Sequence, residues 1–572
     1  MIKGIPVSKG YAIAKVFKFE KVKIDTQTKL ISDPELEIKH YHQAIAQTKE
    51  NILKLKEKSL ERFTEETSKI FDAHLMIAED PEIISSVEAL IRSEKCNLTY
   101  ALNKVVDRFL SLFKDLDNQY LRERAIDLKD VTYHILSFAL DIKGQDLSVI
   151  DEDVILVCED LTPSEMTHVN TTYIKGIVME QGGMTSHSAI IARLLGIPAI
   201  AGVKDIFNKL KNGDDVIVDG FSGRLFYHFD DKTRLSYLEK RETYLNHLAS
   251  LDIFIGKPSE TSDHVQTHLY ANIGSPKDID LAIKHDAEGI GLFRTELLYM
   301  DSHQLPSEEE QFQAYRLVLE RMNPKPVTIR TLDIGGDKFL SYLSFDHELN
   351  PFLGKRAVRL SLAHPEVFKT QIRALLRASV YGQLSIMVPM ISTKEEILLI
   401  KKMISEVKED LMNNDIFVSN YKLGIMIEVP SAVMIADALA KEVDFFSIGT
   451  NDLIQYVFAA DRTNEALNQF YQPLHPSILK MIKIVVDAAK RANIEVSVCG
   501  EMAGHLTQGS LLLGLGIDHL SMTPSEILRM RKHLSFQSYH YLEQAAQSVL
   551  KYESEEQVQK ELKKWIKNEG VS

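Results

Sequence analysis

The sequence predicts a multi-domain α/β protein with a helical insertion in its first half and a (β/α)8 barrel in its second half. A length of 572 residues is too great for one simple core and suggests roughly four domains. Between about residues 33 and 143, apolar residues recur at helical spacing and long stretches lack Gly and Pro. After residue 262, eight short apolar runs alternate with helical stretches, which is the pattern of a β/α barrel.

The composition is that of a soluble globular protein. Hydrophobic residues make up 45% of the chain and charged residues 26%, which excludes collagen-like and disordered classes. Asp plus Glu outnumber Lys plus Arg by 81 to 67, a net charge of −14 that argues against a general nucleic-acid binder. We expect a cytoplasmic protein without stable membrane insertion, because no apolar run approaches the ~20 residues of a membrane span and no signal-peptide pattern is present. The three cysteines form no CxxC pair, which fits a reducing compartment.

Changes in sequence pattern along the chain predict four parts. Residues 1–22 contain too few strands for a core of their own, so we expect them to pair with residues 144–230 in one α/β domain. Residues 23–143 would then be a helical insertion into that domain. Residues 231–262 are charged, helical and end in a Gly/Pro/Ser-rich stretch, which indicates a linker. Residues 263–572 would form the barrel.

The eight predicted barrel strands also predict where the chemistry lies. Barrel active sites lie at the carboxyl ends of the strands. The strand candidates are 268–273, 289–294, 327–333, 384–390, 423–429, 444–449, 495–500 and 518–522. Polar residues gather at or just after these ends: Arg294, Arg330, Glu428, Asn451, Asp452, Arg462 and Cys499.

This set of residue types favours a phosphorylated anion together with a divalent cation. Guanidinium groups bind phosphate through paired, charge-assisted hydrogen bonds, and Arg294, Arg330 and Arg462 could share one phosphoryl group. Mg²⁺ prefers oxygen ligands, often one or two carboxylates, and Glu428 and Asp452 fit that role. Any one of these arginines taken alone is more often structural. The alternative for the carboxylates is that they pair with arginines and bind no metal.

Two further residues have both a chemical and a structural interpretation. Cys499 is either a small buried hydrophobe or a thiol that protonates an enolate leaving group. His187 follows two glycines and Thr-Ser and precedes a helical pattern, so it would lie in the first turn of a helix. Free backbone N–H groups there would stabilise a phosphate carried on the imidazole, which makes His187 a candidate nucleophile. A histidine that only caps or packs the turn is the alternative.

Several long motifs resemble those of the phosphoenolpyruvate-utilising enzymes. The segment Gly182-Gly-x-Thr-Ser-His187-Ser-Ala-Ile-Ile-Ala-Arg, followed by Gly196-Ile-Pro-Ala, resembles their phosphohistidine signature. The barrel motifs that match are Gly291-Leu-Phe-Arg-Thr-Glu296, Arg330-Thr-Leu-Asp-Ile-Gly-Gly-Asp-Lys338, Asn350-Pro-Phe-Leu-Gly-x-Arg356, Asp444-Phe-Phe-Ser-Ile-Gly-Thr-Asn-Asp452, Tyr471-Gln-Pro473 and Cys499-Gly-Glu-x-Ala-Gly504. The order of the parts and the length are similar to the Enzyme I proteins (phosphoenolpyruvate–protein phosphotransferases) of the bacterial sugar phosphotransferase system.

The resemblance implies a two-step phosphoryl relay in the sugar phosphotransferase system. Phosphoenolpyruvate bound in the barrel would phosphorylate His187 of a swivelling phosphohistidine domain and release pyruvate. His187 would then pass the phosphoryl group to a histidine of the phosphocarrier protein HPr. The implied substrate-binding residues are Arg294, Arg330, Asn451, Asp452 and Arg462, with Arg356 a weaker candidate. Glu428 and Asp452 would hold Mg²⁺, Cys499 would donate the proton, and the barrel would form a homodimer.

The helical insertion resembles the HPr-docking domain of these proteins. Its segment 61–94 has nine acidic and three basic residues, which would suit a basic partner, although such a face is usually only solvated. His74 is expected to pack or dock rather than to act as a second nucleophile. Met184, Ile454 and Thr463 depart from the usual Arg, Thr and Gly of the Enzyme I pattern.

Three rival functions are weaker. A pyruvate phosphate dikinase or phosphoenolpyruvate synthase would need a large nucleotide-binding domain, and only 22 residues precede the insertion. A nitrogen-branch paralogue would usually carry an N-terminal sensory domain. A non-catalytic regulatory protein would not need His187, Glu428, Asp452 and Cys499 intact.

Overall fold

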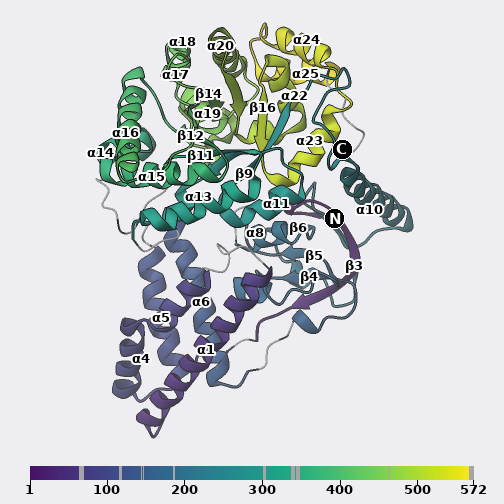
Figure 1. Ribbon diagram of the computed structural model, residues 1–572. Helices are drawn as coiled ribbons and strands as arrows, with labels where there is room; N and C mark the ends of the chain where they lie inside the picture. Colours follow the sequence, from purple (N-terminus) through teal and green to yellow (C-terminus); the bar gives the residue numbers. More distant parts are fainter. Residues whose placement is uncertain are drawn as a thin grey trace. The chain divides into compact units, whose positions relative to one another are not determined.

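The computed structural model describes residues 1–22, 24–62, 70–114, 119–142, 145, 147–183, 187–300, 304–336, 340, 342, 348–462 and 464–565. The chain divides into two compact units, Met1–His247 and Leu248–Ser572, which we describe one at a time (Figure 1). No helix in the described part of the chain is long and apolar enough to cross a bilayer.

The first unit contains one eight-stranded mixed sheet. Its strands are β1 (Ile2–Lys3), β2 (Ile5–Ser8), β3 (Tyr11–Phe19), β4 (Val154–Cys158), β5 (Ile174–Met179), β6 (Ala199–Ala201), β7 (Asp215–Asp219) and β8 (Arg224–Phe226), in the order β1-β8-β7-β3-β4-β5-β6-β2. Strand β3 pairs parallel with β4 and antiparallel with β7. The N-terminal strands therefore share one sheet with residues 154–226, as the sequence predicts. The helices of this part are α7 (Pro163–Met166), α8 (His187–Leu194) and α9 (Ile206–Lys209).

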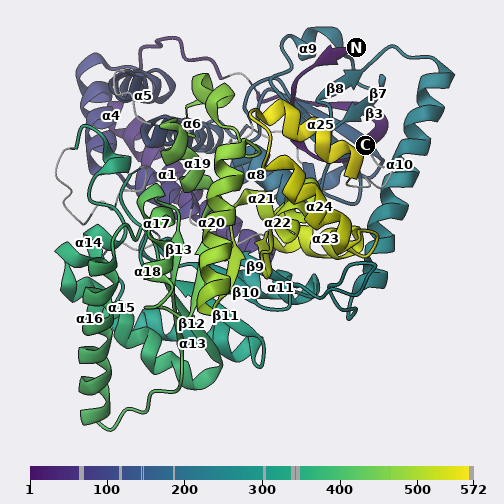
Figure 2. The same cartoon turned by 90° about the horizontal axis from the view of Figure 1, so that it is seen from above.

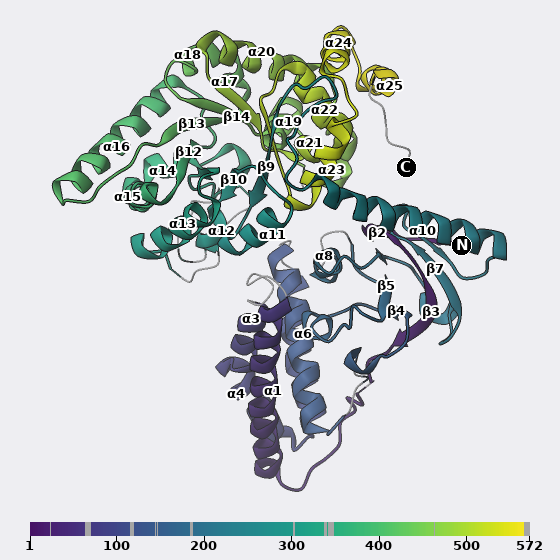
Figure 3. The same cartoon turned by 45° about the vertical axis from the view of Figure 1, so that its right-hand side comes forward.

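Between β3 and β4 the chain forms a helical bundle. Its helices are α1 (Pro34–Arg62), α3 (Ile70–Ala78), α4 (Pro81–Glu94), α5 (Leu98–Lys114) and α6 (Gln119–Ala139). Helices α1 and α6 lie side by side (Figures 1 and 3). The Asp80 side chain accepts hydrogen bonds from two backbone N–H groups at the start of α4, where Pro81 occupies the first helical position. A separate apolar core, which includes Tyr41, Phe71 and Leu102, holds the bundle together.

The second unit is a closed barrel of eight parallel strands. They are β9 (His268–Ile273), β10 (Ile290–Arg294), β11 (Pro326–Arg330), β12 (Gln383–Val388), β13 (Lys422–Ile427), β14 (Phe445–Ile448), β15 (Glu495–Val498) and β16 (His519–Met522). Every strand lies within three residues of its predicted span. Such strands are buried on both faces and therefore read as continuous apolar runs, which is why the sequence indicates them clearly.

Helices surround the barrel strands (Figure 2). The longer ones are α13 (Glu308–Met322), α15 (Pro365–Ala378), α16 (Lys394–Asn413), α20 (Pro476–Ala492), α22 (Leu506–Leu515) and α23 (Pro524–Leu534). Shorter helices follow several strand ends: α11 (Ile279–Lys284), α12 (Glu296–Met300), α14 (Val358–Ala363), α17 (Pro430–Met434), α18 (Ala436–Leu439), α19 (Thr450–Phe458) and α21 (Glu501–Gly504). Helices α24 (Tyr539–Val549) and α25 (Glu555–Trp565) complete the unit.

The predicted linker contains helix α10 (Asp231–Leu251), followed by a short 3₁₀ turn at Asp252–Phe254. The boundary between the two compact units falls inside α10. The finer division of the chain into four domains at the predicted residues stays a prediction.

Candidate functional site

The predicted barrel residues lie at the carboxyl ends of five strands. Arg294 and Arg330 are the last residues of β10 and β11 and are direct partners in the strand register. Glu428 follows β13, and Cys499 follows β15. Asn451 and Asp452 lie in the first turn of α19, which begins two residues after the end of β14. Arg462 follows the same helix.

Arg330 is buried and only partly satisfied by the protein. Its Nη2 donates to Glu296 Oε1 at 2.6 Å and lies 3.1 Å from Asp333 Oδ2. Its Nε is buried and has no hydrogen-bond partner among the described residues. A buried donor without a partner costs free energy, so this N–H group is available for an anion in the barrel mouth.

Arg356 holds two carboxylates at once. Its Nε and Nη2 donate to the two oxygens of Asp333 at 2.9 and 3.2 Å. Its Nη1 and Nη2 donate to the two oxygens of Asp452 at 2.9 and 3.3 Å. The Arg356 side chain is 2% exposed; its Nη1 also donates to the Tyr456 hydroxyl at 3.2 Å, and its guanidinium lies 5.9 Å from the centre of the Phe352 ring. In this structure Arg356 therefore positions carboxylates rather than presenting free donors to a substrate.

The backbone next to Arg356 is strained. Ala357 has φ 52° and ψ −118°, a region that residues with a Cβ rarely occupy. The surrounding contacts, including the hydrogen bonds of Arg356 to both Asp333 and Asp452, hold the chain in this conformation. Strain of this kind gathers at functional sites, where it fixes a side chain in one direction.

Glu428 is a buried carboxyl group with one satisfied oxygen. Oε1 accepts a hydrogen bond from the Met390 N–H at 2.7 Å, whereas Oε2 has no hydrogen-bond partner in the described part of the chain. Burial raises the pKa of Glu428 well above its usual value, and the charges of Asp452 and Asp333 raise it further. A Cβ added to Gly449 would lie 2.7 Å from Oε2, so a side chain at this position would crowd the oxygen.

The charges around Glu428 fit a divalent cation. Two buried guanidinium groups, those of Arg330 and Arg356, share the site with the buried carboxyl groups of Glu296, Asp333, Glu428 and Asp452. No group of three or more His, Cys, Asp or Glu with metal-binding geometry occurs in the residues that the structure describes. Both oxygens of Asp452 accept hydrogen bonds from Arg356, as in the alternative without a metal, whereas Glu428 Oε2 has no such partner among the described residues. Glu428, with Asp452, could hold a cation together with substrate oxygens and water, which is how Mg²⁺ is usually held.

Cys499 is a free thiol inside the barrel mouth. Its side chain packs with Leu292, Met387, Met426 and Phe445 and is 4% exposed. Burial raises the pKa of the Cys499 thiol, an effect that the nearby charges of Arg330 and Arg294 partly offset. The group is therefore protonated at neutral pH and carries a proton that it can donate.

The remaining predicted residues line the same end of the barrel. The Arg294 side chain is exposed and lies close enough to Cys499 to affect its pKa. Asn451 Nδ2 donates to Glu501 Oε1 at 3.2 Å, and Asn451 Oδ1 accepts from the Glu501 N–H at 3.1 Å. Burial and the charge of Glu501 raise the pKa of Tyr471 to about 12, and Arg462 opposes this rise. The structure thus brings the predicted barrel residues together.

His187 is the first residue of α8, as predicted, in the first unit. Its side chain lies outside what the structure describes. The next residue, Ser188, donates from Oγ to Asp160 Oδ1 at 3.0 Å and so ties the first turn of α8 to the loop after β4. Of the three departures from the Enzyme I pattern, Met184 and Thr463 lie outside the described residues, and Ile454 is fully buried in α19.

His74 is a packing residue, which agrees with one of its two predicted roles. It is fully buried in α3, and its Nε2 lies 3.2 Å from Asp127 Oδ1 of α6. Its Nδ1 lies 3.9 Å from Asp130 Oδ2, which accepts a hydrogen bond from Ser164 of α7. His74 therefore helps to join the helical bundle to the α/β part of the first unit.

Sequence reasoning missed Glu296 and Asp333. Both stand inside motifs that the sequence analysis quotes, but an acidic residue after a strand usually faces water. Their burial beside Arg330 becomes visible only when the strand ends are brought together. Asn272, at the end of β9, was also missed; its Nδ2 donates to the Cys499 carbonyl at 3.1 Å.

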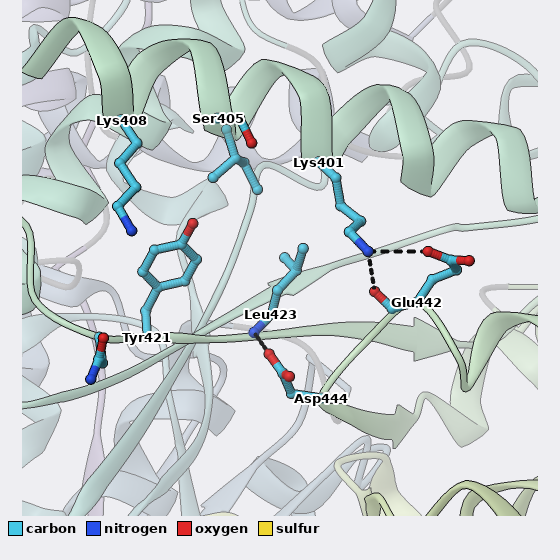
Figure 4. Close-up of a pocket in the computed structure, with 9 residues that line it drawn as sticks. Lys401, Ser405, Lys408, Tyr421, Leu423, Glu442 and Asp444 are labelled. Carbon is cyan, nitrogen blue, oxygen red and sulfur yellow. Dashed lines mark hydrogen bonds and ion pairs between the residues drawn. The ribbon is translucent and has the colours of Figure 1, made fainter.

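The amino-terminal ends of β13 and β14 border a hollow of about 350 Å³ (Figure 4). Lys401 donates to the backbone and side-chain oxygens of Glu442, and Asp444 accepts from the Leu423 N–H at 2.7 Å. Because these charged groups already have partners within the protein, the hollow does not compete with the carboxyl-end cluster as the functional site.

Comparisons with known proteins cover most of the chain. Three family profiles match: the PEP-utilising enzyme N-terminal domain at residues 3–124, the mobile domain at 150–223 and the PEP-binding domain at 249–538. A phosphoenolpyruvate-protein phosphotransferase of Bacillus sp. (strain S) is 45% identical over 93% of this chain and 92% of its own. Proteins with the same name from Bacillus subtilis (strain 168) and Staphylococcus carnosus (strain TM300) are 44% and 42% identical. The first covers 97% of this chain and 98% of its own, and the second covers 99% of each.

Proposed function

The chain belongs to the family of PEP-utilising enzymes, and from this membership we propose a relay in which His187 takes the phosphoryl group of phosphoenolpyruvate and passes it to a histidine of HPr. Relatives that align over nearly the whole chain are phosphoenolpyruvate-protein phosphotransferases, and this chain has the same activity. The observation that carries the barrel half of the proposal is that two buried groups whose charges act on each other each keep an atom without a hydrogen-bond partner among the described residues: Arg330 Nε and Glu428 Oε2. One group fits the anion and the other a cation.

In the first step, phosphoenolpyruvate lies at the carboxyl ends of the barrel strands. Arg294, Arg330 and Arg462 bind its phosphate and carboxylate, and Asn451 and Asp452 orient it. Mg²⁺ held by Glu428 and Asp452 would neutralise charge on the substrate oxygens. Arg356 and Asp333 keep Asp452 and Arg330 in place through the contacts described above.

The transfer to His187 moves one phosphoryl group, and the release of pyruvate consumes one proton. An imidazole nitrogen of His187 forms a bond to phosphorus while the bond from phosphorus to the enol oxygen breaks, which leaves the enolate of pyruvate. The Cys499 thiol donates its proton to the methylene carbon of the enolate, and pyruvate leaves. The thiolate regains a proton from water. The phosphoryl group on His187 is then transferred to the histidine of HPr, which restores the enzyme.

For the HPr partner we propose docking on the helical bundle. Met76 of α3 is 58% exposed and offers an apolar contact beside acidic residues of the predicted docking segment. Five of the acidic residues described in this segment have partners within the bundle: Asp72 with Lys56, Glu79 with Lys49, Glu82 with Arg108, Glu88 with Arg92 and Glu94 with Lys104. Electrostatic attraction to a basic partner therefore rests on fewer free charges than the sequence count suggests, and apolar contact at Met76 contributes more.

The proposal includes a cytoplasmic location and a homodimer formed through the barrel. The three cysteines are free and buried, which supports a reducing compartment. The homodimer rests on the resemblance alone. Sedimentation velocity at several concentrations tests it, and a chain that stays monomeric at tens of micromolar would contradict it.

The relay is tested with radiolabelled phosphoenolpyruvate and Mg²⁺, with and without purified HPr. We expect label on the wild-type chain and its transfer to HPr, and no label on His187→Ala. His168→Ala, which changes another histidine of the same α/β part, is the matched control and should be labelled like wild type. Label that persists on His187→Ala would refute the relay.

A further inference from the structure

We propose that Asn272, held by Ser521, is a positioning residue that directs the Cys499 thiol toward the enolate carbon. The inference rests on the proposed function, because it assumes that Cys499 donates the proton. It assigns a role in the reaction to a pair of polar side chains on β9 and β16 that contact no other predicted site residue among those described.

The Cys499 peptide lies where the strand no longer holds it. Strand β15 ends at Val498, and the last backbone bond on this side joins the Cys499 N–H to the Ile448 carbonyl at 3.2 Å. The next residue is Gly500, where a Cβ would lie 1.8 Å from Thr450 Oγ1, so no side chain is tolerated. Glycine leaves the backbone free to rotate, and the Cys499 carbonyl therefore needs an anchor from elsewhere.

Asn272 supplies that anchor. Its Nδ2 donates to the Cys499 carbonyl oxygen at 3.1 Å and also lies 3.3 Å from the Ser521 carbonyl oxygen. Hydrogen bonds therefore hold both backbone polar groups of Cys499: its N–H donates to the Ile448 carbonyl, and its carbonyl accepts from Asn272. The direction of the Cα–Cβ bond, and hence the position of Sγ, follows from these two bonds.

Ser521 fixes the orientation of the Asn272 amide. Its Oγ donates to Asn272 Oδ1 at 2.5 Å, so the NH₂ end of the amide must face the Cys499 carbonyl. Ser521 is fully buried, and Gly291 of β10 makes room for it, since a Cβ there would lie 2.3 Å from Ser521 Oγ. Residues of β9, β10 and β16 thus cooperate to orient one donor.

Proton delivery is sensitive to such an anchor. The thiol is buried among apolar side chains, and its contact from Sγ to the Ile448 carbonyl is long, at 3.9 Å. The Ser447 side chain is close enough to lower the pKa of the thiol, which burial raises. Proton transfer requires donor and acceptor within hydrogen-bond reach. A displacement of about 1 Å at a reacting group lowers rates roughly 100-fold, so a rotated Cys499 peptide should slow protonation while phosphoenolpyruvate still binds.

The matched control is Thr267→Val. Thr267 Oγ1 donates to the Asp518 carbonyl at 2.9 Å, and the two residues directly precede β9 and β16. This bond ties the same two strands together at the opposite end of the barrel. If the Asn272–Ser521 pair serves only to join β9 to β16, the Thr267 variant should resemble the Asn272 variant.

The test compares Asn272→Ala, Ser521→Ala and Thr267→Val in the full chain, each with and without Cys499→Ala. Pyruvate formation is followed with phosphoenolpyruvate, Mg²⁺ and HPr, in H₂O and in D₂O. We expect Asn272→Ala to lower kcat roughly 10- to 100-fold with an unchanged KM and a larger solvent isotope effect. Ser521→Ala should give a smaller change in the same direction, and Thr267→Val none.

The Cys499→Ala background separates positioning from a structural role. If Asn272 acts through the thiol, Asn272→Ala has no further effect once the thiol is absent. Equal losses in both backgrounds, a raised KM, or failure of both Asn272→Ala and Ser521→Ala to fold while Thr267→Val folds would overturn the inference. If Cys499→Ala itself forms pyruvate at the wild-type rate, the proton-donor step of the proposed function fails instead, and the labelling of His187 tests the relay independently.

Discussion

Replacing Arg356 by methionine removes the cation that holds Asp452. The structure gives Asp452 two hydrogen bonds from this guanidinium, at 2.9 and 3.3 Å, and no other basic partner among the described residues. Asp333 keeps Arg330 at 3.1 Å, so only one carboxylate is left unpaired. Breaking a buried ion pair by removing one partner typically costs about 3–5 kcal/mol, and we expect a loss of that size in the free energy of unfolding of the barrel unit.

Urea unfolding without Mg²⁺ measures this loss. The chain has one tryptophan, Trp565, at the end of α25 in the barrel unit, so its fluorescence reports that unit. Arg359→Met is the matched control, because the hydrogen bonds of Arg359 within the described residues go from Nη1 to the backbone carbonyls of Leu353 and Gly354, with no carboxylate involved. Adding Mg²⁺ should stabilise Arg356→Met more than wild type, since the cation restores a partner to Asp452. A loss below about 1 kcal/mol, or one equal to that of Arg359→Met, would refute the reasoning.

Three other predictions follow from the barrel unit. Because the pKa of Glu428 is raised, the folded state loses stability as pH rises above the usual carboxyl pKa. Glu428→Gln should therefore raise the thermal midpoint of the metal-free chain at pH 8. The same variant should bind Mg²⁺ about tenfold or more weakly in calorimetry. Gly449→Ala places a Cβ against Glu428 Oε2 and should also weaken Mg²⁺ binding, with circular dichroism unchanged. Burial, with a smaller effect of Arg529, lowers the pKa of His533 to about 4. Below about pH 6.5 the unfolded state therefore takes up a proton that the folded state does not, and up to about 3 kcal/mol of stability should be lost by pH 4, a loss that His533→Gln removes in pH-dependent urea unfolding.

Each of these predictions has a contrary outcome. A Glu428→Gln chain that is no more stable than wild type at pH 8 would show that the buried carboxyl carries no unfavourable charge. Unchanged Mg²⁺ affinity in Gly449→Ala would place the cation away from Oε2. An equal acid loss in wild type and His533→Gln would assign the pH dependence to other groups.

The barrel could be predicted from the sequence because its strands are apolar on both faces and end in polar residues. Arg294, Arg330 and Glu428 were found for this reason: each breaks an apolar run at the point where a strand ends. Asp333 and Asn272 could not be found in this way. Asn272 contacts residues at other strands, and Asp333 contacts Arg356, which lies 23 positions away along the chain. No local pattern distinguishes either residue from a solvated loop residue. The hydrogen bonds of Arg356 to both carboxylates depend on residues 23 and 96 positions away along the chain. Only closure of the barrel brings them together.

In the helical insertion, too, the sequence predicts the helices but not the partners of their side chains. Its helices are predicted by the helical spacing of apolar residues between about residues 33 and 143. The burial of His74 against Asp127 is not, because a histidine at a helical apolar position has the same spacing whether it packs or faces a partner. The internal partners of Asp72 and Glu79 were likewise invisible to a count of acidic residues.

The placement of β3 in the middle of the N-terminal sheet has a consequence for biosynthesis. Its neighbours β4 and β7 are made long after it, and β1 pairs with β8, so the sheet cannot close until Arg224–Phe226 has left the ribosome. At ~5–20 residues per second the first strands wait on the order of 10–40 s, while the helical bundle can fold first. Nascent chains stalled before β4 should therefore protect the bundle, but not residues 1–22, from protease, because every partner strand of those residues comes later. Protection of residues 1–22 in such chains would show that another part of the chain shelters them.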